Sequence, residues 1–411
     1  MKKKLLLSSI LLFGVTGCLL NPKINFLLST PGYLVDYPET VEIDNRIAKS
    51  LNEFSVILYN ELYKDNENIF ISPASIYLAL GMTVNGANGD TYNQMIDVLK
   101  ANDYSLEELN KLNKSLQSLI LSYEKTNTAL TNSIWIRDTY HDKVKESFIN
   151  RNKEYYGPMI STLDFNDSRA KDTINNWVKK NTNNLIDKII EEDIDPLTVM
   201  FLINTIYFKA DWENQFEKEN TTNREFINST GKVNIPTMNK IDSLGYIKND
   251  KLEGVLLPYK GNETSMFIIM PEEGINNYYL NGNVINLIEE MKKNKVNLNL
   301  YMPKVDIDYK ASLKDPFINL GMTIPFTGNA DFSEMANNAV EDGLHIADIL
   351  HKTVLKIDEK GTEAAAATSV EMKLEMAPRY DYTLKIDKPF ILGIIDNKND
   401  AILFLGGINE L

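Results

Sequence analysis

The sequence predicts an α+β fold, with helices gathered in the first part of the chain and strands dominating the rest. Helical spacing of apolar residues is concentrated before residue 190, whereas alternating or continuous apolar runs prevail after residue 199. No regular strand–helix–strand repeat is present, so a mixed or antiparallel sheet is expected rather than a doubly wound parallel one. The 411 residues are 43% hydrophobic and 24% charged, which is typical of a chain that buries a core.

The first 17 residues are expected to be a signal peptide of the lipoprotein type. Lys2–Lys4 precede an apolar run too short to span a bilayer, and "VTGC" at 15–18 resembles the bacterial lipobox, whose cysteine is diacylated. Cys18 is the only cysteine, which excludes an internal disulfide. Residues 18–42 carry three prolines and are expected to tether the lipid to the domain. We therefore expect a secreted protein that is lipid-anchored to the cell envelope, at the outer membrane or cell surface.

The remainder, 43–411, is expected to be one large domain, since no internal segment has the composition of a flexible linker. Its first half predicts a helix, a short strand entering a second helix at Ser72 and Pro73, two further helices, a strand and a last helix capped by Ser168. These lie at 45–63, from 68 to a break at Gly86, Gly89 and Asp90, and at 91–99, 105–123, 131–138 and 168–190.

The second half predicts mainly strands. The apolar run at 199–212 is expected to be buried on both faces, and 254–274 reads as a hairpin around Gly261 and Asn262. Residues 295–308 alternate as one strand with one apolar face, and further strands are expected at 347–359 and 379–405.

The sequence lacks the patterns that indicate catalysis. Its three histidines, His141, His345 and His351, form no zinc-binding motif, and no nucleophile elbow, phosphate loop or dinucleotide fingerprint is present. We expect no metal, no cofactor and no enzymatic activity. A net charge of −14 disfavours nucleic acid as a partner, because an acidic protein repels phosphates.

One segment combines two conflicting signals. Residues 364–367 are four alanines, which favour a helix, yet 362–375 alternates strictly between two sets of side chains. The small or apolar set is Thr362, Ala364, Ala366, Thr368, Val370, Met372 and Leu374, and the other set holds every charge. This is the pattern of a strand with one buried and one wet face, preceded by Gly361 as a hinge. A conflict between local propensity and pattern is expected at a site that adopts two conformations.

The chain resembles the serpins, and "EKGTEAAAAT" at 359–368 is the most diagnostic stretch. Five other regions are similar to serpin motifs in the family's order: "NIFISPASIYLALGMTVNGANGDT" at 68–91, "NTIYFKADWENQF" at 204–216, "ADFSEM" at 330–335, "DKPFILGI" at 387–394 and "ILFLGGI" at 402–408. The resemblance covers 43–411. It implies helices around three β-sheets, and a metastable native state that exposes a reactive-centre loop at about 359–380.

The resemblance implies an irreversible suicide-substrate inhibitor of serine, or also cysteine, endopeptidases. The target would cleave the loop, form an acyl-enzyme and be trapped as the loop inserts into the central sheet. Counting fourteen residues from Gly361 predicts the reactive bond Glu375–Met376, with bonds at Lys373 or Leu374 as alternatives. The hinge would comprise Glu359, Gly361, Thr362, Glu363, Ala364, Ala365, Ala366, Ala367 and Thr368. A protein of this type is expected to be monomeric.

Four residues match the serpin shutter, a hydrogen-bonded cluster beneath the point where the sheet parts: Ser72, Ser75, Asn204 and His351. Ordinary buried polar groups that satisfy one another would give the same pattern. No basic face is concentrated on 91–123, so no heparin activation is expected. The alternative function is a non-inhibitory serpin-fold lipoprotein that acts as a binding protein, although such members usually carry bulky or charged hinge residues.

Overall fold

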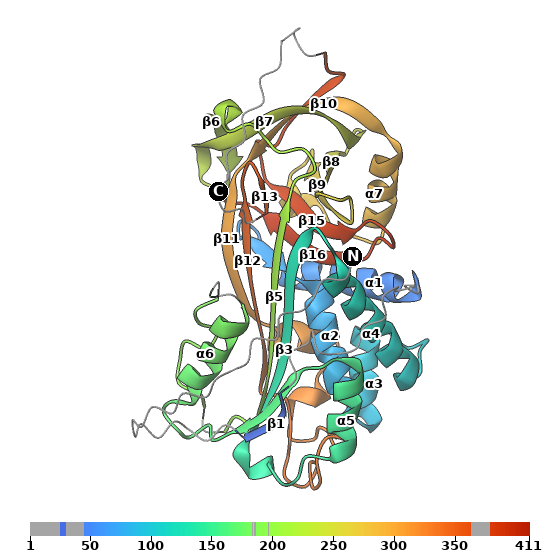
Figure 1. Ribbon diagram of the computed structural model, residues 1–411, viewed down its shortest axis with the longest axis vertical. Helices are drawn as coiled ribbons and strands as arrows, with labels where there is room; N and C mark the ends of the chain where they lie inside the picture. Colours follow the sequence, from blue (N-terminus) through green and yellow to red (C-terminus); the bar gives the residue numbers. More distant parts are fainter. Residues whose placement is uncertain (1–24, 30–44, 183, 185, 196, 363–378) are drawn as a thin grey trace, which may run out of the picture.

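The structure of the protein is a computed structural model that describes residues 25–29, 45–182, 184, 186–195, 197–362 and 379–411 (Figure 1). The α+β prediction is confirmed, with helices packed around two hydrogen-bonded β-sheets. The helices are α1 Asn45–Leu62, α2 Pro73–Val84, α3 Gly89–Val98, α4 Leu106–Ser122, α5 Glu146–Tyr155, α6 Ala170–Asn181, α7 Val284–Lys293 and α8 Lys314–Asn319.

Helix starts follow local capping chemistry. The Ser72 side chain accepts a hydrogen bond from the backbone N–H of Ser75, and Pro73 occupies the first position of α2. The predicted cap at Ser168 is wrong, because α6 begins after Arg169 and no side chain caps it. The Asp167 carboxylate instead accepts the backbone N–H of Arg169 at 2.9 Å. The helix also ends at Asn181, earlier than expected, and the described residues between it and Met200 belong to no helix or strand.

The first sheet holds seven strands in the order β1-β4-β3-β5-β13-β12-β11. Their bounds are β1 Asn25–Ser29, β3 Thr126–Arg137, β4 Met159–Leu163, β5 Met200–Asp211, β11 Val305–Ser312, β12 Asp348–Ile357 and β13 Gly361–Thr362. Residues 25–29, inside the segment expected to be a tether, pair antiparallel with β4 at the edge of this sheet. The domain therefore holds part of that segment in its sheet.

The second sheet holds nine strands, β14-β10-β7-β8-β9-β15-β16-β2 with β6 paired to β7. Their bounds are β2 Ile69–Ile71, β6 Thr222–Asn228, β7 Gly231–Lys248, β8 Leu252–Pro258, β9 Thr264–Pro271, β10 Lys295–Pro303, β14 Tyr382–Lys385, β15 Phe390–Asp396 and β16 Ile402–Ile408. The 18-residue β7 pairs with β6, β8 and β10. These pairs join two of the three expected sheets into one, so the described residues form two sheets. The hairpin prediction is confirmed by the antiparallel β8–β9 pair.

The single strand expected at 295–308 is wrong, since the chain changes sheet there. Pro303 ends β10 in the second sheet, and the N–H of Lys304 donates to the carbonyl of Pro236 at 2.9 Å. Val305 then begins β11 at the edge of the first sheet. The apolar positions change phase at the break, from even-numbered residues up to Met302 to odd-numbered residues at Val305 and Ile307, and this shift is the signal that the prediction missed.

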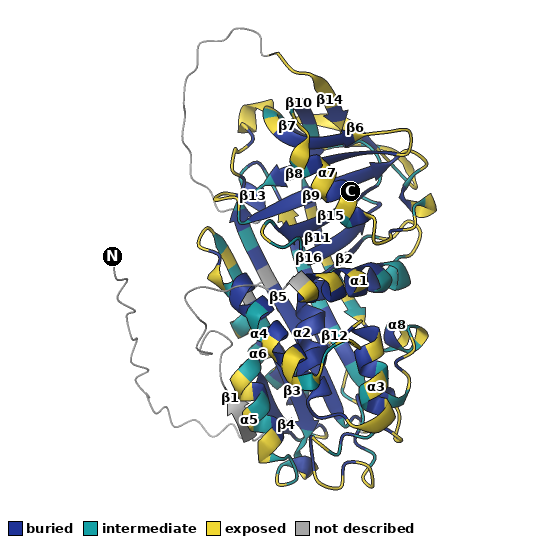
Figure 2. Cartoon of the chain, turned by 90° about the vertical axis from the view of Figure 1, so that its right-hand side faces the viewer, coloured by how far each residue is buried: buried dark blue, intermediate teal, exposed yellow. Residues whose placement is uncertain are grey.

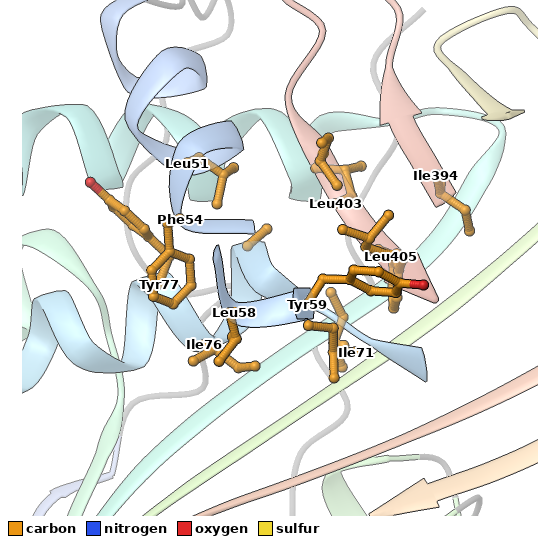
Figure 3. Packing of buried hydrophobic residues seen from close by; sticks show 14 of the residues in the cluster. Leu51, Phe54, Leu58, Tyr59, Ile71, Ile76, Tyr77, Ile394, Leu403 and Leu405 are labelled. Carbon is orange, nitrogen blue, oxygen red and sulfur yellow. The ribbon is translucent and has the colours of Figure 1, made fainter. Parts of the chain in front are cut away.

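The main core lies between α1, α2 and the second sheet, where Phe54, Tyr77, Ile71 and Leu405 are fully buried (Figure 3). A separate cluster lies between the first sheet and α6, and it includes Trp135, Ile203 and Ile189. Most described side chains of β5 are buried, β3 is buried mainly from Leu130 onward, and β12 is buried at alternate positions, so much of the first sheet is covered (Figure 2). Among the described residues, no helix is both long and apolar enough to cross a bilayer.

Candidate functional site

The two central strands of the first sheet are joined at one end only. Residues Asp348–Lys352 of β12 pair in parallel with Phe201–Thr205 of β5. Beyond them, 206–209 and 353–356 make no pair with each other within the described part of the chain. Farther along, β13 lies between the strands, with Gly361 and Thr362 opposite Asp211 and Ala210, and Thr362 opposite Ile357 (Figure 1). The sheet is therefore divided, and Gly361 and Thr362, from the start of the segment predicted to be the reactive-centre loop, already occupy the division.

Gly361 is required by close backbone approach. A Cβ built on Gly361 would lie 2.0 Å from the carbonyl oxygen of Ala210 and 2.7 Å from the Cα of Asp211. Neither atom belongs to a side chain that could move aside. The sequence predicted a glycine hinge at this position, and the geometry adds that any larger residue would displace β13 from β5.

Thr362 faces the core, as the alternating pattern predicts. Its side chain is 2% exposed, and its Oγ1 lies 2.6 Å from the hydroxyl oxygen of Tyr259. The Tyr259 ring stacks on Trp212 at 4.6 Å between centroids, and the Trp212 indole N–H donates to the carbonyl of Asp358 at 3.0 Å. The entrance to the division is thus lined by two large, fixed aromatic rings.

Glu359 anchors the start of the hinge through an ion pair and a hydrogen bond. Its carboxylate lies 2.7 Å from the Lys304 ammonium and accepts the Thr221 hydroxyl at 2.8 Å. Burial alone would raise the pKa of Glu359, but these two donors hold the pKa below its ordinary value. Glu359 is 8% exposed, whereas the Lys304 side chain is 34% exposed, so the ion pair is shielded from solvent on the glutamate side only. The backbone carbonyl of Glu359 also accepts the N–H of Phe216 at 2.8 Å.

The four residues expected to form the shutter lie in one buried hydrogen-bond network. The backbone N–H of Ser72 donates to Nε2 of His351 at 3.1 Å, and Nδ1 of His351 lies 2.8 Å from Oδ1 of Asn204. The Asn204 amide donates to the hydroxyl of Ser75 and to Oδ1 of Asn132. The Ser72 hydroxyl donates to the carbonyl of Leu403 at 2.8 Å. The network ties α2 and the second sheet to the joined ends of β5 and β12.

The network determines the protonation of His351. Because the Ser72 N–H must donate, Nε2 is an acceptor, and the proton of the neutral ring lies on Nδ1 and donates to Asn204. His351 is fully buried, and this desolvation lowers its pKa from 6.5 to about 3. The ring is therefore neutral at physiological pH, and protonation would remove the acceptor of Ser72.

Several predicted residues lie outside the described residues. These are Cys18, the rest of the hinge from Glu363 to Thr368, the reactive bond Glu375–Met376 and its alternatives at Lys373 and Leu374. The other histidines take no part in the site: Nδ1 of His141 lies 3.1 Å from Oγ1 of Thr162, and Nδ1 of His345 lies 2.7 Å from the carbonyl of Gly343. No group of three or more potential metal ligands occurs among the described residues.

Sequence reasoning missed Asn132, Tyr259 and Lys304. Asn132 lies on β3 and supplies an acceptor that the four predicted residues lack. Tyr259 and Lys304 contact the hinge from 103 and 55 positions earlier in the chain. No local pattern links such distant residues.

A family model described as "Serpin (serine protease inhibitor)" matches residues 49–411. An uncharacterized serpin-like protein of Thermococcus kodakarensis is 31% identical, and the alignment covers 99% of this chain and 98% of that protein. The chain belongs to the serpin family. Neuroserpin of Gallus gallus is 31% identical over 88% of this serpin and 90% of its own length.

Solved serpin structures agree with this fold. The thermophilic serpin tengpin in its native state matches with a TM-score of 0.82 and 35% identity, covering 90% of this chain and 95% of the tengpin chain. Thyroxine-binding globulin, solved as a complex with thyroxine, matches with a TM-score of 0.79 and 26% identity, covering 89% and 99%. The serpin fold predicted from the sequence motifs is thereby confirmed.

Proposed function

We propose that this serpin is an irreversible suicide-substrate inhibitor of endopeptidases and that its cleaved loop inserts between β5 and β12. The observation that carries the proposal is the division of the first sheet, with β13 in register between the two strands. A sheet that already accepts two residues of the segment, and has unpaired strand edges next to them, is suited to accept more.

The register of β13 predicts where each following residue would pair. Each step along an antiparallel strand moves its partners one residue back, so Glu363–Ala366 would meet 206–209 of β5 and 353–356 of β12. These are the stretches that do not pair with each other. Four residues could therefore enter without breaking a pair between β5 and β12.

Deeper insertion would require the joined ends of the strands to separate. Thr368 lies six positions beyond Thr362. If the pairing of β13 continues on both sides, Thr368 would lie opposite Asn204 on β5 and opposite His351 on β12, two residues that pair with each other in the closed part of the sheet. The 2.8 Å contact between the Asn204 amide oxygen and the His351 ring would be replaced by contacts to the new strand. The shutter network is thus proposed to hold the sheet closed until cleavage frees the segment.

The outer face of the sheet limits the size of the inserting residues. Ile203, Leu350 and Val354 pack beneath α6. The odd-numbered side chains of the inserted segment would point toward this face, so some of them would be buried and not exposed to solvent. Small side chains at 365, 367 and 369 suit this narrow space. Continued in register, Met372 would reach Met200, where β5 begins, so residue 375 would lie at the far end of the sheet.

The proposed reaction begins with attack on the carbonyl of Glu375 by the nucleophile of the target. The bond to Met376 breaks, the new amine takes a proton, and Glu375 remains as an acyl ester or thioester. Insertion would carry this acyl group away from its original position before water hydrolyses it. A glutamate at this position favours a target with a basic specificity pocket, because like charges in a buried pocket cost several kcal/mol.

We also propose that Cys18 is lipidated and attaches the protein to the cell envelope. Support comes from the sequence features before Cys18 and from the position of β1, which starts seven residues later. At about 3.5 Å per residue, this connection would keep the edge of the first sheet within roughly 25 Å of the lipid attachment.

The test is incubation with a panel of serine and cysteine endopeptidases that includes a glutamate-specific one, followed by denaturing electrophoresis. A covalent band near the summed mass, with a released C-terminal peptide that begins at Met376, is expected. Mass spectrometry of this peptide identifies the cleaved bond. Cleavage without any covalent band by every protease that cuts the loop would reject inhibition and favour the binding-protein alternative.

A further inference from the structure

The turn that follows β5 binds the chain just before β13. The backbone N–H of Trp212 donates to the carbonyl of Lys360 at 2.7 Å, and the Trp212 indole N–H donates to the carbonyl of Asp358. The N–H of Phe216 donates to the carbonyl of Glu359 at 2.8 Å. One turn thus binds three consecutive carbonyls, so the position of this turn fixes where β13 enters the sheet.

This turn, residues 212–216 and here called the support turn, packs on Lys240 of β7. The Lys240 ammonium donates to the carbonyl of Asn214 at 2.8 Å and lies 4.7 Å from the ring centroid of Phe216, a cation–π contact. It also pairs with the Asp242 carboxylate at 3.0 Å, and this carboxylate accepts the side-chain amide of Asn214 at 3.0 Å. The Lys240–Asp242 pair therefore binds the support turn to the second sheet through both of its charges.

The ion pair is largely shielded from solvent, since the Lys240 side chain is 9% exposed and that of Asp242 is 13% exposed. Burial lowers the pKa of Lys240, and the Asp242 carboxylate offsets this shift only in part. A buried ion pair of this kind adds little net stability, and apolar side chains of similar size often stabilise a fold as well or better. The pair instead supplies direction, because its hydrogen bonds to Asn214 allow one orientation of the turn.

The pair acts on the second half of the support turn. Trp212, in the first half, is already held by stacking on Tyr259. Lys240 contacts Asn214 at the centre of the turn and Phe216 at its end. Loss of the pair is therefore expected to loosen the Phe216 end, and with it one of the three hydrogen bonds that fix the chain before β13.

We propose that Lys240 and Asp242 are positioning residues for loop insertion, which hold the support turn so that β13 stays in register between β5 and β12. The inference rests on the proposed inhibitory function and adds a determinant of its outcome. After cleavage, insertion competes with hydrolysis of the acyl-enzyme. Insertion starts faster when Gly361 and Thr362 are already fixed, because these residues have no conformational freedom left to lose.

The test compares two double variants of the full-length protein, each of which removes an ion pair without changing the net charge. Lys240→Met with Asp242→Asn removes the proposed positioning pair and leaves neither charge buried alone. Lys232→Met with Glu225→Gln is the matched control, because it removes an ion pair between β6 and β7 whose side chains are 64% and 53% exposed.

A third variant, Lys240→Arg, keeps a cation that can donate to Asn214 and lie over the ring of Phe216. Three quantities are measured for every variant: the melting temperature, the hydrogen exchange of the peptide covering 358–362, and the stoichiometry of inhibition. The stoichiometry is determined with the endopeptidase that gives the covalent band above.

The Lys240→Met/Asp242→Asn variant is expected to melt at the temperature of the unaltered protein or above it. Hydrogen exchange across 358–362 should nevertheless become faster, because the chain before β13 opens more often. The number of molecules cleaved without a complex, per complex formed, should rise about tenfold, the slowing expected from losing one hydrogen bond to a charged group. Lys240→Arg and the control should behave as the unaltered protein does.

A melting temperature that falls together with inhibition would show a purely structural role and overturn the inference. Unchanged stoichiometry in the Lys240→Met/Asp242→Asn variant, with the covalent band intact, would overturn it as well. Absence of the band in the unaltered protein would instead remove the proposed function.

Discussion

Acidification should destabilise the protein through His351. The ring is fully buried and neutral, and its Nε2 is the acceptor of the Ser72 N–H in the described network. Burial lowers the pKa of His351 to about 3, whereas an unfolded chain titrates near 6.5. Below pH 6.5 the unfolded state therefore binds a proton that the folded state does not. Stability is fully present above pH 6.5 and is lost as the pH falls toward 3.

The magnitude follows from the difference between the two pKa values. Each pH unit between 6.5 and 3 costs about 1.4 kcal/mol, so the whole interval is worth on the order of 5 kcal/mol. Between pH 7 and pH 4 the free energy of unfolding should fall by about 3 kcal/mol through this residue alone. That is a large share of the 5–15 kcal/mol typical of folded proteins.

Urea unfolding at several pH values, in the unaltered protein and in His351→Gln, isolates this contribution from that of the carboxylates. His351→Gln keeps an amide oxygen that can accept the Ser72 N–H but does not titrate, so this variant should lose about 3 kcal/mol less than the unaltered protein on going from pH 7 to pH 4. His345→Gln, at a partly exposed histidine, serves as the control. If the unaltered protein and His351→Gln show parallel pH profiles, the reasoning from burial is refuted.

Four further outcomes are expected. Thr362→Arg places an unpaired charge beside Tyr259 at a cost of several kcal/mol, so gels should show cleavage without complexes, whereas Thr362→Val should still form them. Gly361→Ala puts a Cβ against the carbonyl of Ala210 and should raise the stoichiometry of inhibition severalfold. Loop-cleaved protein should melt well above intact protein in calorimetry, and equal melting temperatures would contradict insertion. Cys18→Ser should abolish labelling by radioactive palmitate and release the protein from membranes.

The sequence was sufficient for the fold because its evidence was local. Alternation and capping residues are short-range patterns, and they predicted α1 to α4 and α6, the hairpin and the buried face of Thr362, whereas α5, α7 and α8 were not predicted. The errors also had local causes. The Asp167 carboxylate accepts the N–H of Arg169 beside the expected cap at Ser168, and Pro303 ends a strand beyond which the apolar positions change phase.

The contacts around the hinge could not be predicted in the same way. Lys304 reaches Glu359 because the chain changes sheet just before it, and Tyr259 meets Thr362 across 103 positions. Both contacts depend on how two sheets meet, which periodicity does not encode. Asn132 was equally hidden, since a polar residue in a strand usually faces solvent, and only the sheet order places it beside Asn204.

The conflict between helix propensity and strand pattern at 364–367 has a structural explanation under the proposed function. Continued from β13, Ala364 and Ala366 would point into a core already filled by Phe208, whose ring contacts Tyr259 and Phe404 at 5.3 and 5.6 Å. The alternate positions 365 and 367 would pass along the face that α6 covers. Because side chains already fill the space on both faces of the sheet, an inserting strand has room only for small side chains. Alanine meets this requirement, and its preference for helices is incidental to it.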